Sequence, residues 1–403
     1  GAIRGGHYFM VDGSPIVSDV LFTKGNNNPP VPALGTACTL DGSAACVPQW
    51  EYRTVLIQCL GGGGPGCFAL DVSNPYDPKL LWERQMTTAS TVRQTTSSRP
   101  QIVRMRRMVG GIGIPYSVAL MGGGLGETKA GVPAGSFLAV GLEDGTVTYS
   151  PTQASGPFAG SPTCLDTDND SFTDTCYIST VDAQIYKVRF ANGDPASMSM
   201  ALFFDGRARL GVLGLPGSTT IRSYSRIAVT FDSNRDLRLF YGTGNFEDVQ
   251  NATESNYFFE LRDGDPSAAP GLTAINGSSC GGGTGVNVLG PREKIIFDPI
   301  ISNGTVLFTS YAPDPNPCLT GPGFLYGVSY DKCTAALDDG VVITPLVSKI
   351  TLPSPGMPSQ PVVNDRSGAV TVGLDNGTVI ENAAIITLVR QLSINKLWWR
   401  IVR

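Results

Sequence analysis

Four aspartates lie within nine residues near the middle of the chain, and their spacing is typical of a metal-binding loop. They are Asp166, Asp168, Asp170 and Asp174, at positions 1, 3, 5 and 9 of the loop. Carboxylates this close repel one another unless a cation lies between them. Calcium accepts about six to eight oxygen ligands in irregular geometry, so it is the cation that the pattern favours. The position-7 ligand of such a loop is a backbone carbonyl, here that of Phe172.

The loop differs from an EF-hand in both its sequence and its surroundings. An EF-hand has glycine at position 6 and a bidentate glutamate at position 12, where this chain has Ser171 and Tyr177. The residues that follow, Cys-Tyr-Ile-Ser-Thr-Val, are rich in β-branched and aromatic types and predict a strand. The sequence therefore predicts a nine-residue calcium loop on a β scaffold, and the alternative is an acidic turn exposed to solvent.

The nine cysteines point to an oxidising compartment. Eight of them fall at short spacings that suggest loop-closing pairs: Cys38 with Cys46, Cys59 with Cys67, Cys164 with Cys176, and Cys318 with Cys333. None forms a Cys-x-x-Cys motif of the kind that binds zinc or performs redox chemistry. Cys280 is left over and could replace one of these partners, so the connectivity stays open.

Composition predicts a turn-rich β protein. The 403 residues include 49 glycines and 29 prolines, and 16% are charged. The net charge of −5 with no basic cluster disfavours nucleic acid as a partner. No apolar run approaches the roughly 18 residues that span a membrane. The chain opens within what looks like domain sequence, so we expect a C-terminal fragment of a longer protein.

Catalytic motifs are weak, and we expect no enzymatic activity. The single histidine, His7, has no neighbouring signature of a Ser/His/Asp or Cys/His centre. The glycine run at 61–66 matches G-x-G-x-x-G, but the following residues predict a strand instead of the helix that a dinucleotide site needs. We interpret it as a turn.

A loose repeat of paired apolar runs joined by a turn recurs six times, at residues 53–71, 136–149, 174–190, 237–261, 305–330 and 369–381. Four further strands are expected to begin just after Pro15, Pro100, Pro299 and Pro361, because proline suits a strand start or an edge. Such repeats indicate an all-β propeller over residues 1–403, with loop insertions at 205–223 and 264–292. A seventh blade could be completed by the termini. A solenoid is the alternative, although solenoid repeats are usually more regular.

Several segments, in order, resemble the C-terminal propeller of the PilY/PilC family of type IV pilus tip and biogenesis proteins. They are 8–20, 52–74, 166–174, 239–246 and 298–311. The resemblance implies a modified seven-bladed propeller, one calcium loop, and a role in pilus extension and retraction, adhesion and twitching motility. It implies minor pilins at the pilus tip as partners, and possible host or surface ligands. The expected location is the cell surface at the pilus tip, or the outer membrane or periplasm of a Gram-negative bacterium. The cysteine pairs are not carried over from the family, and no Arg-Gly-Asp tripeptide occurs.

Two other classes of protein use calcium on a propeller. A quinoprotein dehydrogenase would need an adjacent Cys-Cys pair or a comparable cofactor clamp, and the sequence has none. An integrin-like receptor propeller carries calcium loops in several blades, whereas this sequence has one strong loop.

Overall fold

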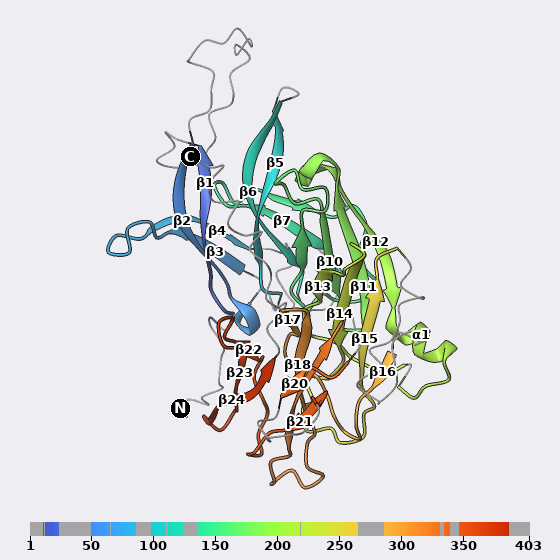
Figure 1. Ribbon diagram of the computed structural model, residues 1–403. Coiled ribbons are helices and arrows are strands. Elements are labelled where there is room, and N and C mark those ends of the chain that lie inside the picture. Colours follow the sequence, from blue (N-terminus) through green and yellow to red (C-terminus); the bar gives the residue numbers. More distant parts are fainter. Residues whose placement is uncertain are drawn as a thin grey trace, which may run out of the picture. The chain divides into compact units, whose positions relative to one another are not determined.

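The computed structural model describes residues 11, 13–23, 50–64, 66–85, 98–109, 112–124, 135–217, 219–264, 286–330, 334–338 and 346–386. Predictions that involve His7, Cys38, Cys46, Cys280 or Cys333 lie outside these residues. The chain divides into two compact units, Gly1–Ile227 and Ala228–Arg403. The strands among the described residues form six antiparallel sheets of four strands each (Figure 1).

The first unit contains three sheets, each made from consecutive strands. The first sheet is β1 (Ile16–Thr23), β2 (Trp50–Cys59), β3 (Gly66–Asp71) and β4 (Lys79–Gln85). The second is β5 (Gln101–Val109), β6 (Ile112–Gly122), β7 (Phe137–Gly141) and β8 (Val147–Tyr149). The third is β9 (Thr163–Leu165), β10 (Thr175–Ser179), β11 (Gln184–Phe190) and β12 (Met198–Asp205).

The second unit contains the other three sheets. The fourth is β13 (Ala228–Phe231), β14 (Leu237–Gly242), β15 (Tyr257–Arg262) and β16 (Val286–Val288). The fifth is β17 (Ile300–Ser302), β18 (Thr305–Tyr311), β19 (Gly323–Ser329) and β21 (Lys349–Thr351). The sixth has the order β20 (Leu337–Asp338), β24 (Val379–Ile386), β23 (Ala369–Gly373) and β22 (Val362–Val363). Its outer strand β20 precedes β21 in the chain, so this sheet is not a simple meander.

The middle sheet of the first unit has apolar residues on both faces. Successive side chains of a strand point to opposite faces, so alternate residues of β6 enter different cores. Ala119 and Met121 join the cluster shared with the first sheet, while Val118 and Leu120 join the cluster shared with the third. Burying one such large aliphatic side chain stabilises the fold by about 1.5–3 kcal/mol.

The second unit repeats this arrangement around the fifth sheet. Phe308 of β18 stacks on Phe258 of the fourth sheet, with ring centroids 4.0 Å apart. The preceding residue of β18, Leu307, belongs to the cluster that contains Val370 and Val372 of the sixth sheet. Within each unit, successive sheets therefore pack face to face, as propeller blades do.

All six predicted repeats are confirmed as antiparallel strand pairs, each within one sheet. The four proline predictions are also confirmed, because β1, β5, β17 and β22 each begin at the residue after a proline. Within the glycine run, Gly61–Gly63 form a 3-10 turn and β3 begins at Gly66, so the expected turn followed by a strand is confirmed. A mostly β fold is thus confirmed for the described residues, while the seven-bladed count and the single-domain organisation remain predictions.

The two predicted loop insertions are partly wrong. Residues 206–212 form the short helix α1 (Gly206–Val212), which the Asp205 side chain caps by accepting a hydrogen bond from the Ala208 N–H. An aspartate at the N-cap can end a strand and begin a helix within one residue. The other insertion ends in β16, which pairs with β15. No helix in the described part of the chain is long and apolar enough to cross a membrane.

Candidate metal site

The acidic loop, residues 166–174, connects two paired strands of the third sheet. Leu165 at the end of β9 is the register partner of Thr175 at the start of β10, so the loop contains the nine residues between them. Both ends are fixed, since the Asp174 N–H donates to the Leu165 carbonyl at 3.1 Å and the Phe190 N–H donates to the Asp174 carbonyl at 2.8 Å. The predicted strand after the loop is confirmed as β10.

A disulfide closes the base of the loop. Cys164 and Cys176 are directly opposite on β9 and β10 and are bonded to each other, as the sequence predicted. The predicted Cys59–Cys67 pair on β2 and β3 is also formed. Cys318 is exposed and has no disulfide partner among the described residues. The two disulfides agree with the oxidising compartment expected from the cysteine spacing.

The outer strand β9 is attached to the second sheet through Gln101 of β5. The Gln101 side chain accepts a hydrogen bond from the Cys164 N–H at 2.9 Å and donates one to the Cys164 carbonyl at 3.2 Å. The Thr173 N–H of the loop donates to the Arg104 carbonyl at 2.9 Å. The loop is therefore supported by strands from two sheets.

Two of the aspartates organise the loop backbone. The Asp174 carboxylate accepts from the Thr167 N–H at 2.8 Å and the Thr167 hydroxyl at 2.7 Å. The Asp166 carboxylate accepts from the Asp170 N–H at 3.1 Å and the Ser171 N–H at 2.6 Å. These bonds curl the chain so that carboxylates separated in sequence face one another.

Two positive φ angles complete the curl. Asn169 has φ 64° and Ser171 has φ 72°, both in the left-handed region. Asparagine tolerates that region better than most residues. Ser171 stands at the position where an EF-hand has its glycine, and it adopts the backbone conformation that glycine favours.

Three of the five predicted ligand residues converge. Carboxylate oxygens of Asp166, Asp168 and Asp174 lie within 4.8 Å of one another. Calcium–oxygen distances are about 2.3–2.6 Å, so two oxygens on one ion can lie up to roughly 5 Å apart. The spacing and the all-oxygen donor set therefore fit a calcium ion.

The side chains of the remaining two predicted ligand residues contact the neighbouring strand β5. Asp170 Oδ2 accepts a hydrogen bond from Arg106 Nη2 of β5 at 2.9 Å. The Phe172 ring lies near two guanidinium groups, 5.0 Å from that of Arg104 and 4.1 Å from that of Arg106. Asp170 thus has a protein cation as its partner and is not part of the converging group.

The electrostatics of Asp168 also favour a cation. The pKa of the Asp168 carboxyl is raised above its usual value. Desolvation in the loop is the largest cause, and the charges of Asp170 and Asp174 and a hydrogen bond with Asp166 add to it. A backbone hydrogen bond from Asp170 acts in the opposite direction and lowers the pKa. A raised carboxyl pKa means that the ionised form is disfavoured. A bound divalent cation would relieve this repulsion.

Sequence reasoning missed the contribution of Arg104 and Arg106. The run Arg104-Met105-Arg106 alternates charged and apolar residues, a pattern that puts both arginines on one face of a strand. The sequence contains no signal for which loop that face would meet, because the contact is made between residues more than sixty positions apart.

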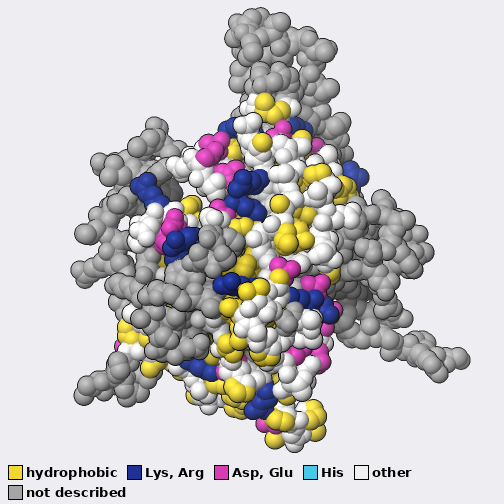
Figure 2. Space-filling view, turned by 90° about the vertical axis from the view of Figure 1, so that its right-hand side faces the viewer, with side chains coloured by type: hydrophobic (Ala, Val, Ile, Leu, Met, Phe, Trp, Pro, Cys, Tyr) yellow, Lys and Arg dark blue, Asp and Glu magenta, His cyan; other side chains and the backbone are white. Residues whose placement is uncertain are grey.

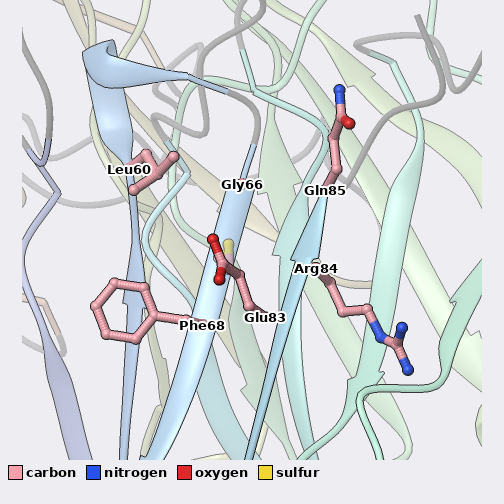
Figure 3. Close-up of a pocket in the computed structure, with 7 residues that line it drawn as sticks. Leu60, Gly66, Phe68, Glu83, Arg84 and Gln85 are labelled. Atoms are coloured by element: carbon pink, nitrogen blue, oxygen red, sulfur yellow. The ribbon is translucent and has the colours of Figure 1, made fainter. Parts of the chain in front are cut away.

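The first sheet carries a hollow of about 210 Å³ beside the Cys59–Cys67 disulfide, lined by Leu60, Gly66, Cys67, Phe68, Glu83, Arg84 and Gln85 (Figure 3). Glu83 and Arg84 are neighbours on β4, so their side chains point to opposite faces, and Figure 3 shows the Arg84 guanidinium directed away from the Glu83 carboxylate. One carboxylate beside the apolar Leu60 and Phe68 does not make a catalytic group, and we assign this hollow no role.

Comparisons with known proteins point to one protein family. No protein-family model matches the chain. A 101-residue stretch is 38% identical to the type IV pilus biogenesis factor PilY1 of Pseudomonas aeruginosa (strain UCBPP-PA14), covering 25% of this chain and 6% of that protein. A 99-residue stretch is 31% identical to the PilY1 homolog of Xylella fastidiosa (strain Temecula1 / ATCC 700964), again 25% of this chain and 6% of that protein.

The fold supports the same relationship. The crystal structure of the Pseudomonas aeruginosa PilY1 C-terminal domain matches with a TM-score of 0.58 and 17% identity, over 93% of this chain and 84% of that one. The sequence matches establish common ancestry over part of the chain, and the structural match extends the shared fold to nearly all of it. The chain is therefore a homologue of the C-terminal domain of PilY1, a type IV pilus biogenesis factor.

Proposed function

We propose that this chain is a non-enzymatic propeller domain of a type IV pilus biogenesis protein and that it binds one calcium ion in the acidic loop. The observation that carries the proposal is the convergence of Asp166, Asp168 and Asp174 in a loop closed by a disulfide. Asp170 and the Phe172 carbonyl would complete the protein ligands, with water filling the remaining positions. The exposed loop without a bidentate glutamate belongs toward the weaker end of the range of calcium affinities, which reaches about 10⁻³ M.

The number of sites supports the pilus assignment over an integrin-like receptor. Within the described residues, one group of three or more potential metal-ligating side chains comes together. Receptor propellers of the integrin type would place such loops on several blades. One calcium per chain is therefore the expected stoichiometry.

Calcium occupancy would act as a local switch for a partner. Without the ion, the clustered carboxylates repel one another and the loop loosens; with it, their charge is largely neutralised and the loop is held against β10. A partner such as a minor pilin at the pilus tip, or a surface ligand, would then meet two different surfaces. The coupling cannot exceed the partner's difference in affinity for the two states, and about 1–3 kcal/mol is typical.

The described part of the face shown in Figure 2 has no large patch of a single charge that would dominate such recognition. On the face shown in Figure 2, basic and acidic side chains are interspersed among the described residues. A change of charge confined to one loop would therefore be noticeable to a partner.

We place the domain at the cell surface on the pilus tip, or in the outer membrane or periplasm.

The test is Asp168→Ala in the full-length protein, followed by measurement of surface pili and twitching motility. Asp168 is the most suitable ligand to remove because its carboxylate accepts a single backbone N–H, that of Asp170 at 3.2 Å, whereas Asp174 holds the loop backbone through the Thr167 N–H at 2.8 Å. Asp314→Ala, in an exposed turn of the second unit, is the matched control. Altered piliation or motility at normal protein abundance supports the switch. Wild-type piliation and motility in a variant that has lost calcium would show that the site is only structural.

A further inference from the structure

An ion pair joins the acidic loop to a different sheet. Arg106 of β5 donates from Nη2 to Asp170 Oδ2 at 2.9 Å, and its guanidinium lies over the Phe172 ring, 4.1 Å from the centroid. Its Nη1 also donates to the Asn192 carbonyl at 3.4 Å. Arg106 therefore contacts two of the five residues expected to bind the ion.

A glycine on the adjacent strand lets Arg106 take this path. A Cβ on Gly113 of β6 would lie 2.4 Å from Cδ and 2.8 Å from Cγ of Arg106. Contacts that short do not occur between real atoms, so any side chain at position 113 would displace the arginine stem. Gly113 does not have a positive φ. The path of Arg106 therefore requires glycine at position 113 because glycine has no side chain, and not because the backbone there is unusual.

The ion pair and the cation site make competing demands on Asp170. Asp166, Asp168 and Asp174 already converge, while Asp170 Oδ2 is occupied by the guanidinium. A cation that recruits the fourth carboxylate therefore competes with Arg106 for the negative charge of Asp170. The pair is partly exposed, with side-chain exposures of 26% and 35%, so water can replace each partner at low cost.

We propose that Arg106 is a built-in competitor of the bound cation. Cation binding takes Asp170 from Arg106, and the Arg106–Asp170 pair in turn lowers the affinity of the loop for the cation. This inference rests on the proposed function, because it concerns regulation of the same loop. By linkage the effect is reciprocal, so ion occupancy at the third sheet changes how firmly Arg106 of the second sheet is held.

The test is calorimetric titration of calcium into the 403-residue chain and its variants. Arg106→Gln is expected to bind calcium roughly two- to five-fold more tightly than wild type, the size expected for removing one exposed ion pair. Gly113→Ala, which keeps the net charge but displaces the Arg106 stem, is expected to tighten binding as well. Arg104→Gln is the matched control, because it removes one positive charge beside the same ring but no contact with Asp170.

A double-mutant cycle isolates the competition. In an Asp170→Asn background, Arg106→Gln is expected to give no further tightening, because the contested carboxylate is gone. If wild type binds calcium but Arg106→Gln behaves like Arg104→Gln, or binds more weakly, the competition is wrong and the calcium site stands. If wild type binds no calcium at any concentration tested, both the site and the competition are wrong.

Discussion

Cys164 and Cys176 are register partners on β9 and β10, and their disulfide joins the chain on either side of the four aspartates. Sheet pairing thus sets the distance between the two ends of the loop, and the covalent bond keeps it set. The carboxylates then need only the curl of the loop backbone to converge on an ion. The Asp166 and Asp174 carboxylates supply that curl by accepting hydrogen bonds from backbone N–H groups.

Removing this disulfide should weaken calcium binding as well as folding. Closing a loop of about a dozen residues is worth roughly 3 kcal/mol in the chain-entropy model, so Cys164→Ala with Cys176→Ala should lower the free energy of unfolding by about that amount. The wider loop ends should also reduce calcium affinity. Denaturant unfolding and calorimetry measure the two effects.

The control is Cys59→Ala with Cys67→Ala, which removes the disulfide of the first sheet. This pair should lower stability but leave calcium affinity within experimental error. Equal loss of affinity in both double variants would mean that the Cys164–Cys176 bond has no specific part in arranging the carboxylates.

Chelation should loosen the acidic loop and leave the sheets intact. The strands of the third sheet are held by backbone pairing and by buried residues such as Ile178 and Val188, neither of which depends on a metal. Hydrogen exchange measured with calcium and then with a chelator should speed up for amides of 166–172 alone. Faster exchange across β10 and β11 would contradict the local character of the switch.

A loop of the second unit is expected to need no metal, because a lysine supplies its positive charge. Lys294 is fully buried, and its Nζ donates to the carbonyls of Asp248 and Asn251 at 3.0 Å each and to the Glu254 carboxylate at 3.3 Å. Lys294→Met leaves a carboxylate without its cation and should cost about 3 kcal/mol of unfolding free energy. Lys79→Met, at an exposed strand end, should cost less than about 0.5 kcal/mol. Equal small losses in a denaturant series would refute this role of the lysine.

The contribution of Asp71 to stability should be lost in acid. Burial would raise the pKa of its carboxyl, but hydrogen bonds from Ser73 and the charges of Arg53 and Lys79 outweigh it, so the pKa is lowered below 3.8. A carboxyl with a lowered folded pKa stabilises the protein above its unfolded pKa and loses that contribution as the pH falls through the folded value. Asp71→Asn should thus cost up to about 1 kcal/mol at neutral pH and progressively less below pH 3.8. A constant difference between variant and wild type across this range would exclude the ionic contribution.

The sequence was sufficient for the local features and insufficient for the contacts between sheets. Alternating apolar runs gave the strand pairs, and prolines marked four strand starts, because both signals depend on neighbouring residues. The Asp spacing and the flanking cysteines likewise act within thirteen residues, from Cys164 to Cys176. Arg106 could not be assigned to Asp170 in this way, since their meeting depends on how the second and third sheets pack.

Two features of the structure were not predicted from the sequence. Helix α1 is a single short helix, too brief for its apolar positions to show a period, and only the Asp205 cap marks its start. Strand β20 of the sixth sheet precedes β21 of the fifth sheet in the chain. It pairs with β24 through only two residues, and so short a strand leaves almost no pattern in the sequence.

The most direct test of the central claim is the calcium stoichiometry of the purified chain and of its Asp168→Ala variant. One bound ion per wild-type chain, lost in Asp168→Ala and retained in Asp314→Ala, is the result expected from three converging carboxylates in one loop. Calcium binding that is unchanged by Asp168→Ala would contradict the assignment of the site to residues 166–174.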